Sequence, residues 1–268
     1  MFKRITNIQS LIKDIIGDFT PKVGIVLGSG LSAFVDSIEV KYSIDYTDIE
    51  GMPHSTVKGH IGRFIFGYVE GTPIVIMQGR LHYYEGWSLD EVVLPIRVMK
   101  MLGIETVLLS TASGGLSSNY KVGDLMAIKD HINFIPNPLI GKNIDELGER
   151  FPPLTNAYTP ELIDLACKCG KEIGVILKKG VFIAISGPSY ETNAEINFYR
   201  MIGGNSISMS TAPEVIAAAH LGLKVFAVSV ITNVHSNLST PSHEEVVMNG
   251  NLASEKLARL YISMIKNL

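Results

Sequence analysis

Hydrophobic positions along the chain recur with two periodicities, and each periodicity predicts a different kind of element. Residues 5 to 17 carry apolar side chains at every third or fourth position, which is the spacing of an amphipathic helix. Further helical patterns cover 89–102, 160–173, 193–202, 212–221 and a closing segment that starts at Ser242. Short apolar or alternating runs predict strands at 22–27, 63–69, 72–78, 105–110, 181–186, 205–209 and 224–231. The alternation of strand and helix in the second half is typical of an α/β fold.

The clearest strand-to-helix junction lies between residues 181 and 195. An apolar strand is followed there by a Gly-Pro-Ser turn, by Glu191, and then by Thr192 and Glu195 at the spacing of a capping box. Glu191 has two interpretations: an acid that the helix dipole favours, or a ligand-binding group at the carboxyl edge of a sheet. Because Thr192 and Glu195 already satisfy the helix start, Glu191 remains available for a ligand.

Two further strands of the second half end in polar residues. The strand at 205–209 leads to Ser210, just before a second capping box, and the strand at 224–231 leads to Thr232 and Asn233. If the strands are parallel, Glu191, Ser210 and Asn233 lie at one edge of the sheet, where open α/β sheets bind ligands.

Glycines and polar residues also follow the strands of the first half. The segment Gly28-Ser29-Gly30 lacks the third glycine of a dinucleotide loop and the Gly-Lys-Ser of a P-loop, so a simple phosphate site and a tight turn both remain open. Arg80, His82 and Tyr84 alternate along a segment predicted to be extended, so their side chains would share one face. That face suits an oxyanion and a sugar hydroxyl, or the polar side of an edge strand. Since the segment directly follows a buried strand, a binding site is favoured.

Two loops are expected between the predicted elements. Small residues at 111–115 follow the strand at 105–110 and would allow a ligand to approach the backbone closely. The region 129–158 is rich in Pro and Asn and is interpreted as a long excursion. Excursions of this length are typical of lids, binding loops and subunit interfaces.

Composition narrows the classes of function. The chain has 268 residues, 46% hydrophobic and 18% charged, with no internal repeat or linker, so one domain over residues 1–268 is expected. A formal net charge of −3 and a pI near 6.2 provide no basic surface for nucleic acid. The N-terminus is too charged for a signal peptide, and no apolar run approaches the roughly 18 residues that span a bilayer. We expect a cytoplasmic protein without a membrane partner, in which Cys167 and Cys169 are reduced thiols.

The polar residues near the predicted strand ends form three chemical groups. Groups that can bind an anion are Ser29, His60, Arg80, His82, the backbone at Ala112, and Ser210. Glu191 and Asn233 pair an acceptor with a donor and suit the edge of a planar heterocycle. Residues that could pack on or hydrogen-bond a sugar are Tyr84, Met209 and His243. The sequence has no Ser–His–Asp order, metal-binding cluster or reactive cysteine, so this inventory fits an anion, a ribose and a base bound side by side.

Eight segments resemble the purine nucleoside phosphorylases, in the trimeric branch that acts on 6-oxopurines. They keep the order of that family along the chain: GSGL (28–31), GHIGR (59–63), MQGRLHYYEG (77–86), TASGGL (111–116), GDLMAIKDHINF (123–134), SGPSYET (186–192), SMSTAPEV (208–215) and SVITN (229–233). The resemblance implies a single-domain α/β fold with a mixed β-sheet flanked by helices. It also implies reversible phosphorolysis of inosine, guanosine and their deoxy forms to free base and (deoxy)ribose 1-phosphate, in purine salvage.

The same resemblance implies a role for each matching residue. Phosphate would be held by Ser29, His60, Arg80, His82, the Ala112 backbone and Ser210. Glu191 would accept from the purine ring N–H, Asn233 would contact the imidazole nitrogen and the 6-oxo oxygen, Thr232 would support that contact, and Tyr190 would lie against the base. The ribose would be surrounded by Tyr84, Met209, His243 and, from a neighbouring subunit of a homotrimer, Phe151. The catalytic set is then Asn233, Glu191 and His82.

The chemistry implied by the resemblance requires neither a metal nor a cofactor, because inorganic phosphate is the co-substrate. Breaking the glycosidic bond leaves positive charge on the ribose and negative charge on the departing purine. Asn233 can donate a hydrogen bond where the negative charge grows, and phosphate is both the nucleophile and the counter-charge.

The chain departs from the usual family pattern at Ser32, Thr111, Ser113 and Ser208, which add side chains near phosphate or base. One alternative, motivated by Thr111, Ser113 and Ser208, is a nucleoside-binding protein that has lost turnover. The other is methylthioadenosine phosphorylase, a relative in which an Asp usually stands at the position of Asn233. Asn233 and the serine of the GSG segment favour the oxopurine branch.

Overall fold

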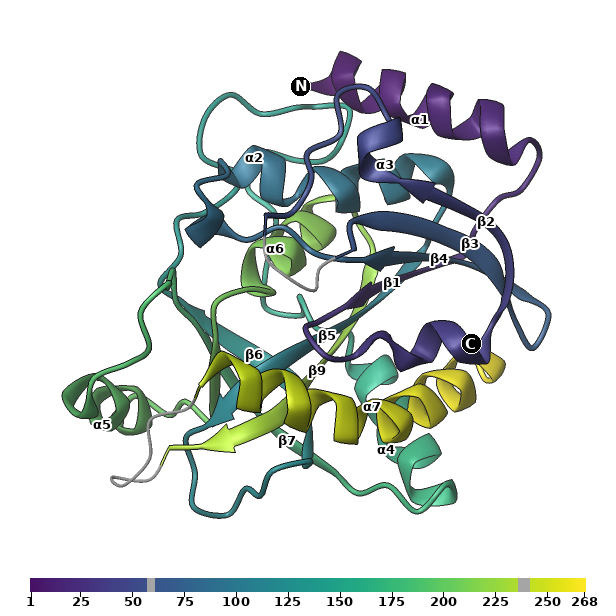
Figure 1. Cartoon of the computed structure of the whole chain (residues 1–268). Coiled ribbons are helices and arrows are strands. Elements are labelled where there is room, and N and C mark those ends of the chain that lie inside the picture. Colours follow the sequence, from purple (N-terminus) through teal and green to yellow (C-terminus); the bar gives the residue numbers. More distant parts are fainter. Residues whose placement is uncertain (57–60, 236–241) are drawn as a thin grey trace.

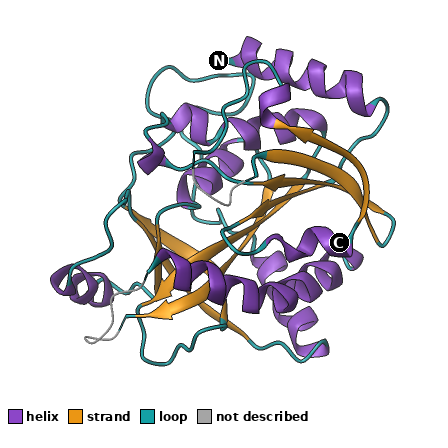
Figure 2. Ribbon diagram, viewed as in Figure 1, coloured by secondary structure: helices purple, strands orange, loops and turns teal. Residues whose placement is uncertain are grey.

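The computed structural model describes residues 1–56, 61–235 and 242–268, apart from the side chains of Ser32, Ala33 and His243. Within these ranges the strands form one nine-stranded mixed sheet in the order β2-β3-β4-β1-β5-β8-β7-β6-β9 (Figure 2). Their bounds are β1 Val23–Leu27, β2 Glu39–Asp45, β3 Arg63–Val69, β4 Thr72–Gln78, β5 Thr106–Gly115, β6 Leu125–Asn133, β7 Leu177–Ala184, β8 Ser206–Ser208 and β9 Lys224–Val234.

The sheet closes on itself at one end, because β9 pairs with β6 and also with β5. The strands β5, β8, β7, β6 and β9 therefore form a closed ring, while β1 to β4 extend from β5 as an open, twisted sheet (Figure 1). The β5–β9 and β7–β8 pairs are parallel, and the β5–β8 and β6–β9 pairs are antiparallel. The expected mixed α/β sheet flanked by helices is confirmed.

Helices cover the sheet on both sides. Their bounds are α1 Phe2–Ile16, α2 Leu89–Val92, α3 Leu94–Leu102, α4 Pro160–Glu172, α5 Asn193–Met201, α6 Ala212–His220 and α7 His243–Lys266, with short 3-10 helices at Ser32–Ser37, Tyr46–Asp48 and Tyr83–Glu85. In Figure 1, α1, α2, α3 and α6 lie on one side, α4 and α7 on the other, and α5 projects beyond the ring of strands. In the part of the chain that is described, none of these helices combines the length and apolar character needed to cross a membrane.

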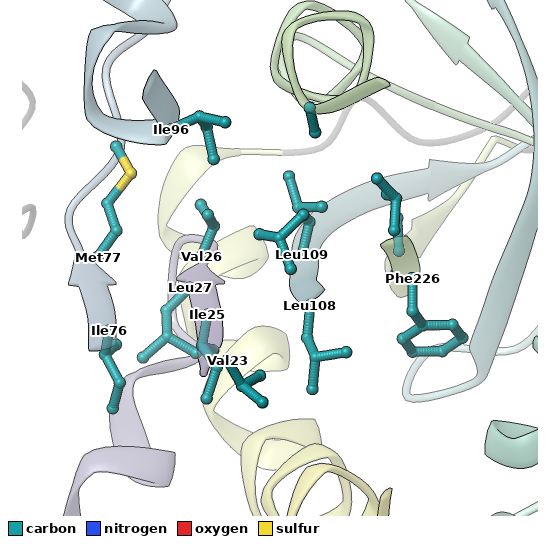
Figure 3. Packing of buried hydrophobic residues seen from close by; sticks show 14 of the residues in the cluster. Val23, Ile25, Val26, Leu27, Ile76, Met77, Ile96, Leu108, Leu109 and Phe226 are labelled. Carbon is teal, nitrogen blue, oxygen red and sulfur yellow. The ribbon is translucent and has the colours of Figure 1, made fainter. Parts of the chain in front are cut away.

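The core is centred on β1, whose five residues are all buried. Figure 3 shows β1 side chains between those of β4 and β5, with Ile96 of α3 above and Phe226 of β9 beside them. A strand that is covered on both faces must be apolar throughout, which is why VGIVL has no alternation. The packing of β1 against β4 and β5 anchors the ends of these three strands. The segments that follow them therefore begin at well-defined positions.

Most predicted elements are present, and the errors concentrate near strand ends. The predicted loop at 111–115 continues β5, Thr232 and Asn233 belong to β9, and β6 occupies the beginning of the expected excursion. The predicted helix 89–102 is divided at Val93, where Pro95 lies in the first turn of α3. A ladder that remains paired continues as a strand even when its residues are small or polar, so composition alone misplaces these ends.

Two geometric assumptions were wrong. Arg80, His82 and Tyr84 do not alternate along an extended strand, because β4 ends at Gln78 and Tyr84 lies in a 3-10 turn. The strands before Glu191, Ser210 and Asn233 are not all parallel either, since β9 is antiparallel to β6, which is itself parallel to β7. Closure of the ring, rather than a common strand direction, brings these groups together.

Candidate active site

One cavity gathers the ends of six strands. It encloses about 680 Å³ of empty space, opens to solvent, and is lined by segments that follow β1, β4, β7 and β8, by the ends of β5 and β9, and by α7. The predicted site residues that line it are Ser29, Arg80, His82, Tyr84, Ala112, Tyr190, Glu191, Met209, Ser210, Thr232 and Asn233. Residues as far apart in the sequence as Ser29 and Asn233 thus meet as expected, although the expected strand geometry was incorrect.

Three predicted residues are not seen in this cavity. His60 lies outside the described residues, as does the side chain of His243 at the start of α7. Phe151 is 84% exposed and lines a separate hollow with Leu139, Ile140 and Ile216. Its ring therefore does not reach the cavity of its own chain.

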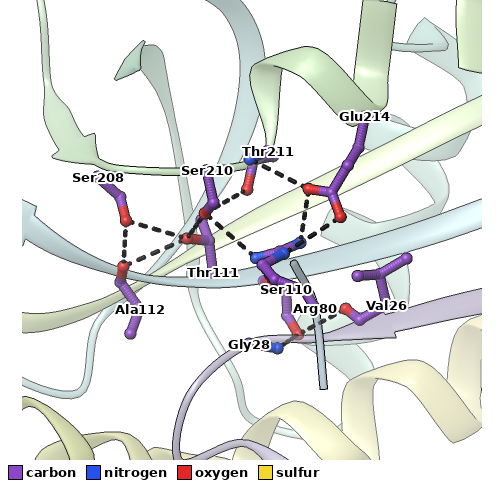
Figure 4. A network of polar contacts seen from close by, with 10 residues as sticks. All are labelled: Val26, Gly28, Arg80, Ser110, Thr111, Ala112, Ser208, Ser210, Thr211 and Glu214. Carbon is purple, nitrogen blue, oxygen red and sulfur yellow. Dashed lines mark hydrogen bonds and ion pairs between the residues drawn. The ribbon is translucent and has the colours of Figure 1, made fainter. Parts of the chain in front are cut away.

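Arg80 provides a buried cation at one end of the cavity. Only 1% of the residue is exposed, and its Nη2 and Nε atoms lie 3.1 and 3.2 Å from the Glu214 carboxylate of α6. Its Nη1 donates to the Ser110 carbonyl (3.0 Å) and to the Ser210 hydroxyl (3.3 Å) (Figure 4). Glu214 also accepts from the Thr211 backbone N–H, at 3.1 Å, in the predicted capping box. One carboxylate thus fixes both the start of α6 and the direction of the guanidinium.

Hydroxyl groups extend this polar cluster along β5. Thr111 Oγ1 lies 3.1 Å from Ser210 Oγ and 3.3 Å from Ser208 Oγ, and Ser208 Oγ donates to the Ala112 carbonyl at 2.8 Å. Figure 4 shows this chain of contacts joining β5 to the segment after β8. Thr111 and Ser208 are two of the family departures, so their side chains connect the strand ends instead of blocking the cavity. Hydroxyls can donate or accept, which suits the rim of an anion site.

His82 is held by a carboxylate beneath it. Its Nδ1 lies 2.9 Å from Oε1 of Glu85, whose side chain is 1% exposed, and its ring stacks on Tyr84 at a centroid distance of 4.7 Å. Burial disfavours the Glu85 anion, but hydrogen bonds from His82 and Thr56 outweigh burial and lower the pKa of Glu85 to about 2. Burial and the Glu85 charge raise the pKa of Tyr84 to about 12, so its phenol is a neutral donor at physiological pH.

The other end of the cavity carries Glu191 and Asn233. Thr192 and Glu195 form the predicted capping box, with hydrogen bonds of 2.7 and 3.2 Å, so the start of α5 does not require the Glu191 carboxylate. Burial raises the pKa of Glu191, with a smaller contribution from the charge of Glu195. Thr232 Oγ1 donates to Asn233 Oδ1 at 3.3 Å, which directs the amide nitrogen of Asn233 to other partners.

Sequence reasoning missed several residues that shape the cavity. Glu85 and Glu214 support His82 and Arg80 from behind. The His82–Glu85 pair is local, three residues apart in a 3-10 turn, whereas the Arg80–Glu214 pair joins distant segments. His235 lines the cavity two residues after Asn233, and the two-residue period of a strand could have indicated it. Within the described ranges, no cluster of three His, Cys, Asp or Glu side chains is arranged to hold a metal ion.

Comparisons with known proteins agree with this geometry. Residues 22–266 match the family model of the phosphorylase superfamily. Purine nucleoside phosphorylase 1 of Bacillus subtilis is 43% identical, with 99% of this chain and 97% of the relative aligned. The solved structure of Schistosoma mansoni purine nucleoside phosphorylase with inosine superposes with a TM-score of 0.94, at 39% identity over 99% of this chain and 96% of that one. A Schistosoma purine nucleoside phosphorylase with guanosine gives a TM-score of 0.92, at 38% identity over 99% of this chain and 97% of that one.

The depressed pKa of Glu85 leads to a pH-dependent stability. A group with a folded-state pKa of about 2 and an ordinary pKa of 4.5 stabilises the protein fully above pH 4.5, and that contribution is lost as the pH falls toward 2. We expect Glu85→Gln to lower the free energy of unfolding by about 3 kcal/mol at pH 6 and by much less near pH 2. Denaturant unfolding at both pH values measures this.

The exposed Glu172 of α4 offers a matched control. Glu172→Gln should change the free energy of unfolding by less than about 0.5 kcal/mol at either pH. An equal loss of stability for Glu85→Gln at pH 6 and pH 2 would contradict the role assigned to the His82–Glu85 pair.

Proposed function

The chain belongs to the phosphorylase superfamily and, within it, to the purine nucleoside phosphorylases, and from this we propose that its cavity binds phosphate at the Arg80 end and a 6-oxopurine at the Glu191 end. The protein is a pentosyltransferase that carries out reversible phosphorolysis of purine nucleosides. We infer that inosine, guanosine and their deoxy forms are its substrates. The observation that carries the proposal is that the Arg80 cluster and the Glu191–Asn233 pair line one cavity.

We assign phosphate to Arg80, Ser210, Ser29, His82 and the Ala112 backbone, with His60 as a further ligand by family resemblance. The support is a guanidinium that is already oriented by Glu214 and surrounded by hydroxyl donors. Because Glu214 balances the charge of Arg80, this end of the cavity does not carry a large excess of positive charge that would hold a sugar phosphate too tightly. The site can therefore bind phosphate and release a sugar phosphate with one preorganised set of donors.

We assign the purine to Glu191, Asn233, Thr232 and Tyr190. A phosphate oxygen forms the new bond to C1′ of the ribose while the C1′–N9 bond breaks, and the bonding electron pair leaves with the purine, which takes up a proton. An amide N–H of Asn233 is then the donor to the ring where negative charge grows, and Thr232 fixes the direction of that amide. Glu191 accepts from the ring N–H and holds the base in register.

We assign the ribose to Tyr84, Met209 and His243, together with Phe151 from a neighbouring subunit of a homotrimer. Two observations support the contribution from a neighbour. Phe151 is highly exposed in its own chain. Phe134 and Phe198 form an exposed aromatic cluster with Tyr199, at centroid distances of 5.5 to 6.2 Å, and such a cluster is typical of a surface covered in an assembly.

The remaining expectations are carried as proposals. We propose one functional domain over residues 1–268, a cytoplasmic location, and phosphate as co-substrate without a further cofactor. Both cysteines are free thiols, which fits a reducing compartment. The slightly negative net charge fits a partner set of nucleoside and phosphate rather than nucleic acid.

The test of the proposed function is the phosphate requirement of base release. Hypoxanthine should appear from inosine only when phosphate is present, with a rate that saturates in phosphate. Ser210→Ala should raise the KM for phosphate about 10-fold, because a donor next to Arg80 is lost. Ser229→Ala, which removes a buried hydroxyl outside the cavity, should leave that KM unchanged.

Other outcomes distinguish the alternatives. Hypoxanthine release in phosphate-free buffer would identify a hydrolase. Binding of inosine by calorimetry without any turnover would identify a nucleoside-binding protein. Faster turnover of methylthioadenosine than of inosine would identify the methylthioadenosine branch.

Asn233→Asp should move substrate preference toward adenosine. A carboxyl group can share a proton with the 6-amino group of adenine, whereas the amide suits a 6-oxo group. We expect the kcat/KM for inosine to fall about 100-fold while that for adenosine rises, measured by base release at saturating phosphate. The exposed Asn197→Asp on α5 provides the same chemical change outside the cavity. Unchanged inosine selectivity in Asn233→Asp would remove Asn233 from the base site.

Phe151→Ala tests the contribution of a neighbouring subunit. Loss of a buried aromatic contact should raise the KM for inosine about 10-fold or more. Ile140→Ala, at an exposed apolar position lining the same hollow, should have a smaller effect. Mixing Phe151→Ala with Glu191→Ala subunits should restore activity, because some mixed sites then combine an intact pocket with an intact Phe151. Wild-type protein that is monomeric and fully active would contradict this assignment.

A further inference from the structure

His235 is a cavity residue to which the proposed reaction gives no task. It is the first residue after β9, only two positions beyond Asn233, and it is buried. It lines the same cavity as Glu191 and Asn233, and its backbone N–H donates to the Gly115 carbonyl of β5 at 3.0 Å. Its imidazole therefore belongs to the purine end of the cavity.

The His235 ring faces the carboxylate assigned to the purine. Nε2 of His235 lies 3.4 Å from Oε2 of Glu191, and the two side chains are only 5% and 4% exposed. Oε2 is fully buried and accepts no hydrogen bond from the described residues, so the 3.4 Å approach of Nε2 is close but longer than a formed hydrogen bond. A ring nitrogen with a lone pair would repel this oxygen, so the favoured tautomer carries its proton on Nε2 and points it at Oε2.

The ionisation of the pair agrees with this geometry. Burial lowers the pKa of His235, and the charge of Arg200 lowers it further, so the imidazole is neutral at physiological pH. Burial raises the pKa of Glu191. A neutral imidazole N–H next to a carboxyl group is an oriented dipole and not a full ion pair.

The imidazole has little room to move away. A methyl group added at Gly114 of β5 would lie 2.4 Å from Nε2, so the ring rests directly on the bare backbone of that strand. Arg200 of α5 donates from Nη2 to the His235 carbonyl at 2.5 Å and from Nε to the Leu116 carbonyl at 2.6 Å. The backbone on both sides of the ring is thus fixed by β5 and by α5.

The donor pattern of a purine determines what this arrangement accepts. Hypoxanthine presents one donor to Glu191, the ring N1–H. Guanine presents two neighbouring donors, N1–H and the exocyclic 2-amino group, and needs both carboxylate oxygens. With the imidazole Nε2–H facing Oε2, N1–H can use the other carboxylate oxygen, whereas a 2-amino group directed at Oε2 would approach a second donor there.

We propose that His235 is a specificity-determining residue that makes the site prefer purine nucleosides with hydrogen at C2, such as inosine, over those with a 2-amino group, such as guanosine. The inference rests on the assignment of the purine to Glu191. It adds to that assignment a preference for hydrogen over an amino group at C2 of the purine, set by the His235 side chain next to Glu191.

The test compares kcat/KM for inosine and guanosine at saturating phosphate. Wild-type protein should favour inosine by about 10-fold or more, the effect of one mismatched hydrogen bond next to a carboxylate. His235→Ala and His235→Val should shift the ratio toward guanosine by about 10-fold, mainly through a lower KM for guanosine. His235→Gln, whose amide can still donate to Oε2, should stay nearer the wild-type ratio. His54→Ala, an exposed histidine outside the cavity, should leave the ratio unchanged.

Three results would overturn the inference. The first is wild-type protein that uses guanosine as well as inosine. The second is a His235→Ala variant that changes both nucleosides by the same factor, because a purely structural role would do so. The third is a wild-type Kd for guanine that equals or is below the Kd for hypoxanthine in calorimetry. The calorimetric comparison needs no variant, so it decides the matter even if the His235 variants do not fold.

A failure of the proposed function would look different. Absence of phosphate-dependent turnover with every nucleoside would reject phosphorolysis, while the relative affinities for hypoxanthine and guanine would still report on His235. Phosphate-dependent turnover without discrimination at C2 would reject only the role of His235.

Discussion

The cavity depends on how β5 and β9 are paired. The ladder runs in parallel register from Thr106 with Lys224 to Ser113 with Ile231, and then skips Thr232, so that Gly114 faces Asn233. This bulge places an extra residue in β9 at the cavity wall. In a regular strand neighbouring side chains point to opposite faces, yet Thr232 and Asn233 both line the cavity. His235, two residues beyond Asn233, then joins the same wall.

The buried charges at the anion-binding end of the cavity are paired with each other. At the anion end, Arg80 and Glu214 neutralise each other through contacts of 3.1 and 3.2 Å, with hydroxyl and carbonyl partners around them. A lone buried guanidinium would cost several kcal/mol in desolvation, and the pair avoids most of that cost. The pair also keeps the guanidinium in one orientation before an anion arrives. Preorganisation of this kind means that binding does not have to order the side chain.

Local sequence predicted the elements better than their geometry. Capping boxes at Thr192, Thr211 and Ser242 are all present, because each depends on residues only three positions apart. The alternation assumed for 80–84 and the parallel direction assumed for β9 were wrong, because both depend on how distant strands close into a ring. The convergence of Arg80, Glu191 and Asn233 was nevertheless predicted. Polar residues just after buried strands indicate a ligand site at the edge of the sheet, whether the strands are parallel or close into a ring.

The sequence did not indicate which residues position another side chain rather than contact a ligand. Glu85 and Glu191 are both carboxylates near the cavity, and the local sequence indicated a ligand-binding role for Glu191 without indicating that Glu85 supports His82. Glu85 receives hydrogen bonds from His82 and Thr56, so its pKa falls to about 2 and it is charged at physiological pH. Burial, with a smaller contribution from the charge of Glu195, raises the pKa of Glu191, and its Oε2 accepts no hydrogen bond from the described residues. The first carboxylate is therefore part of the framework. The second gains most from a ligand that brings donors, which is the physical reason to place substrate recognition at Glu191.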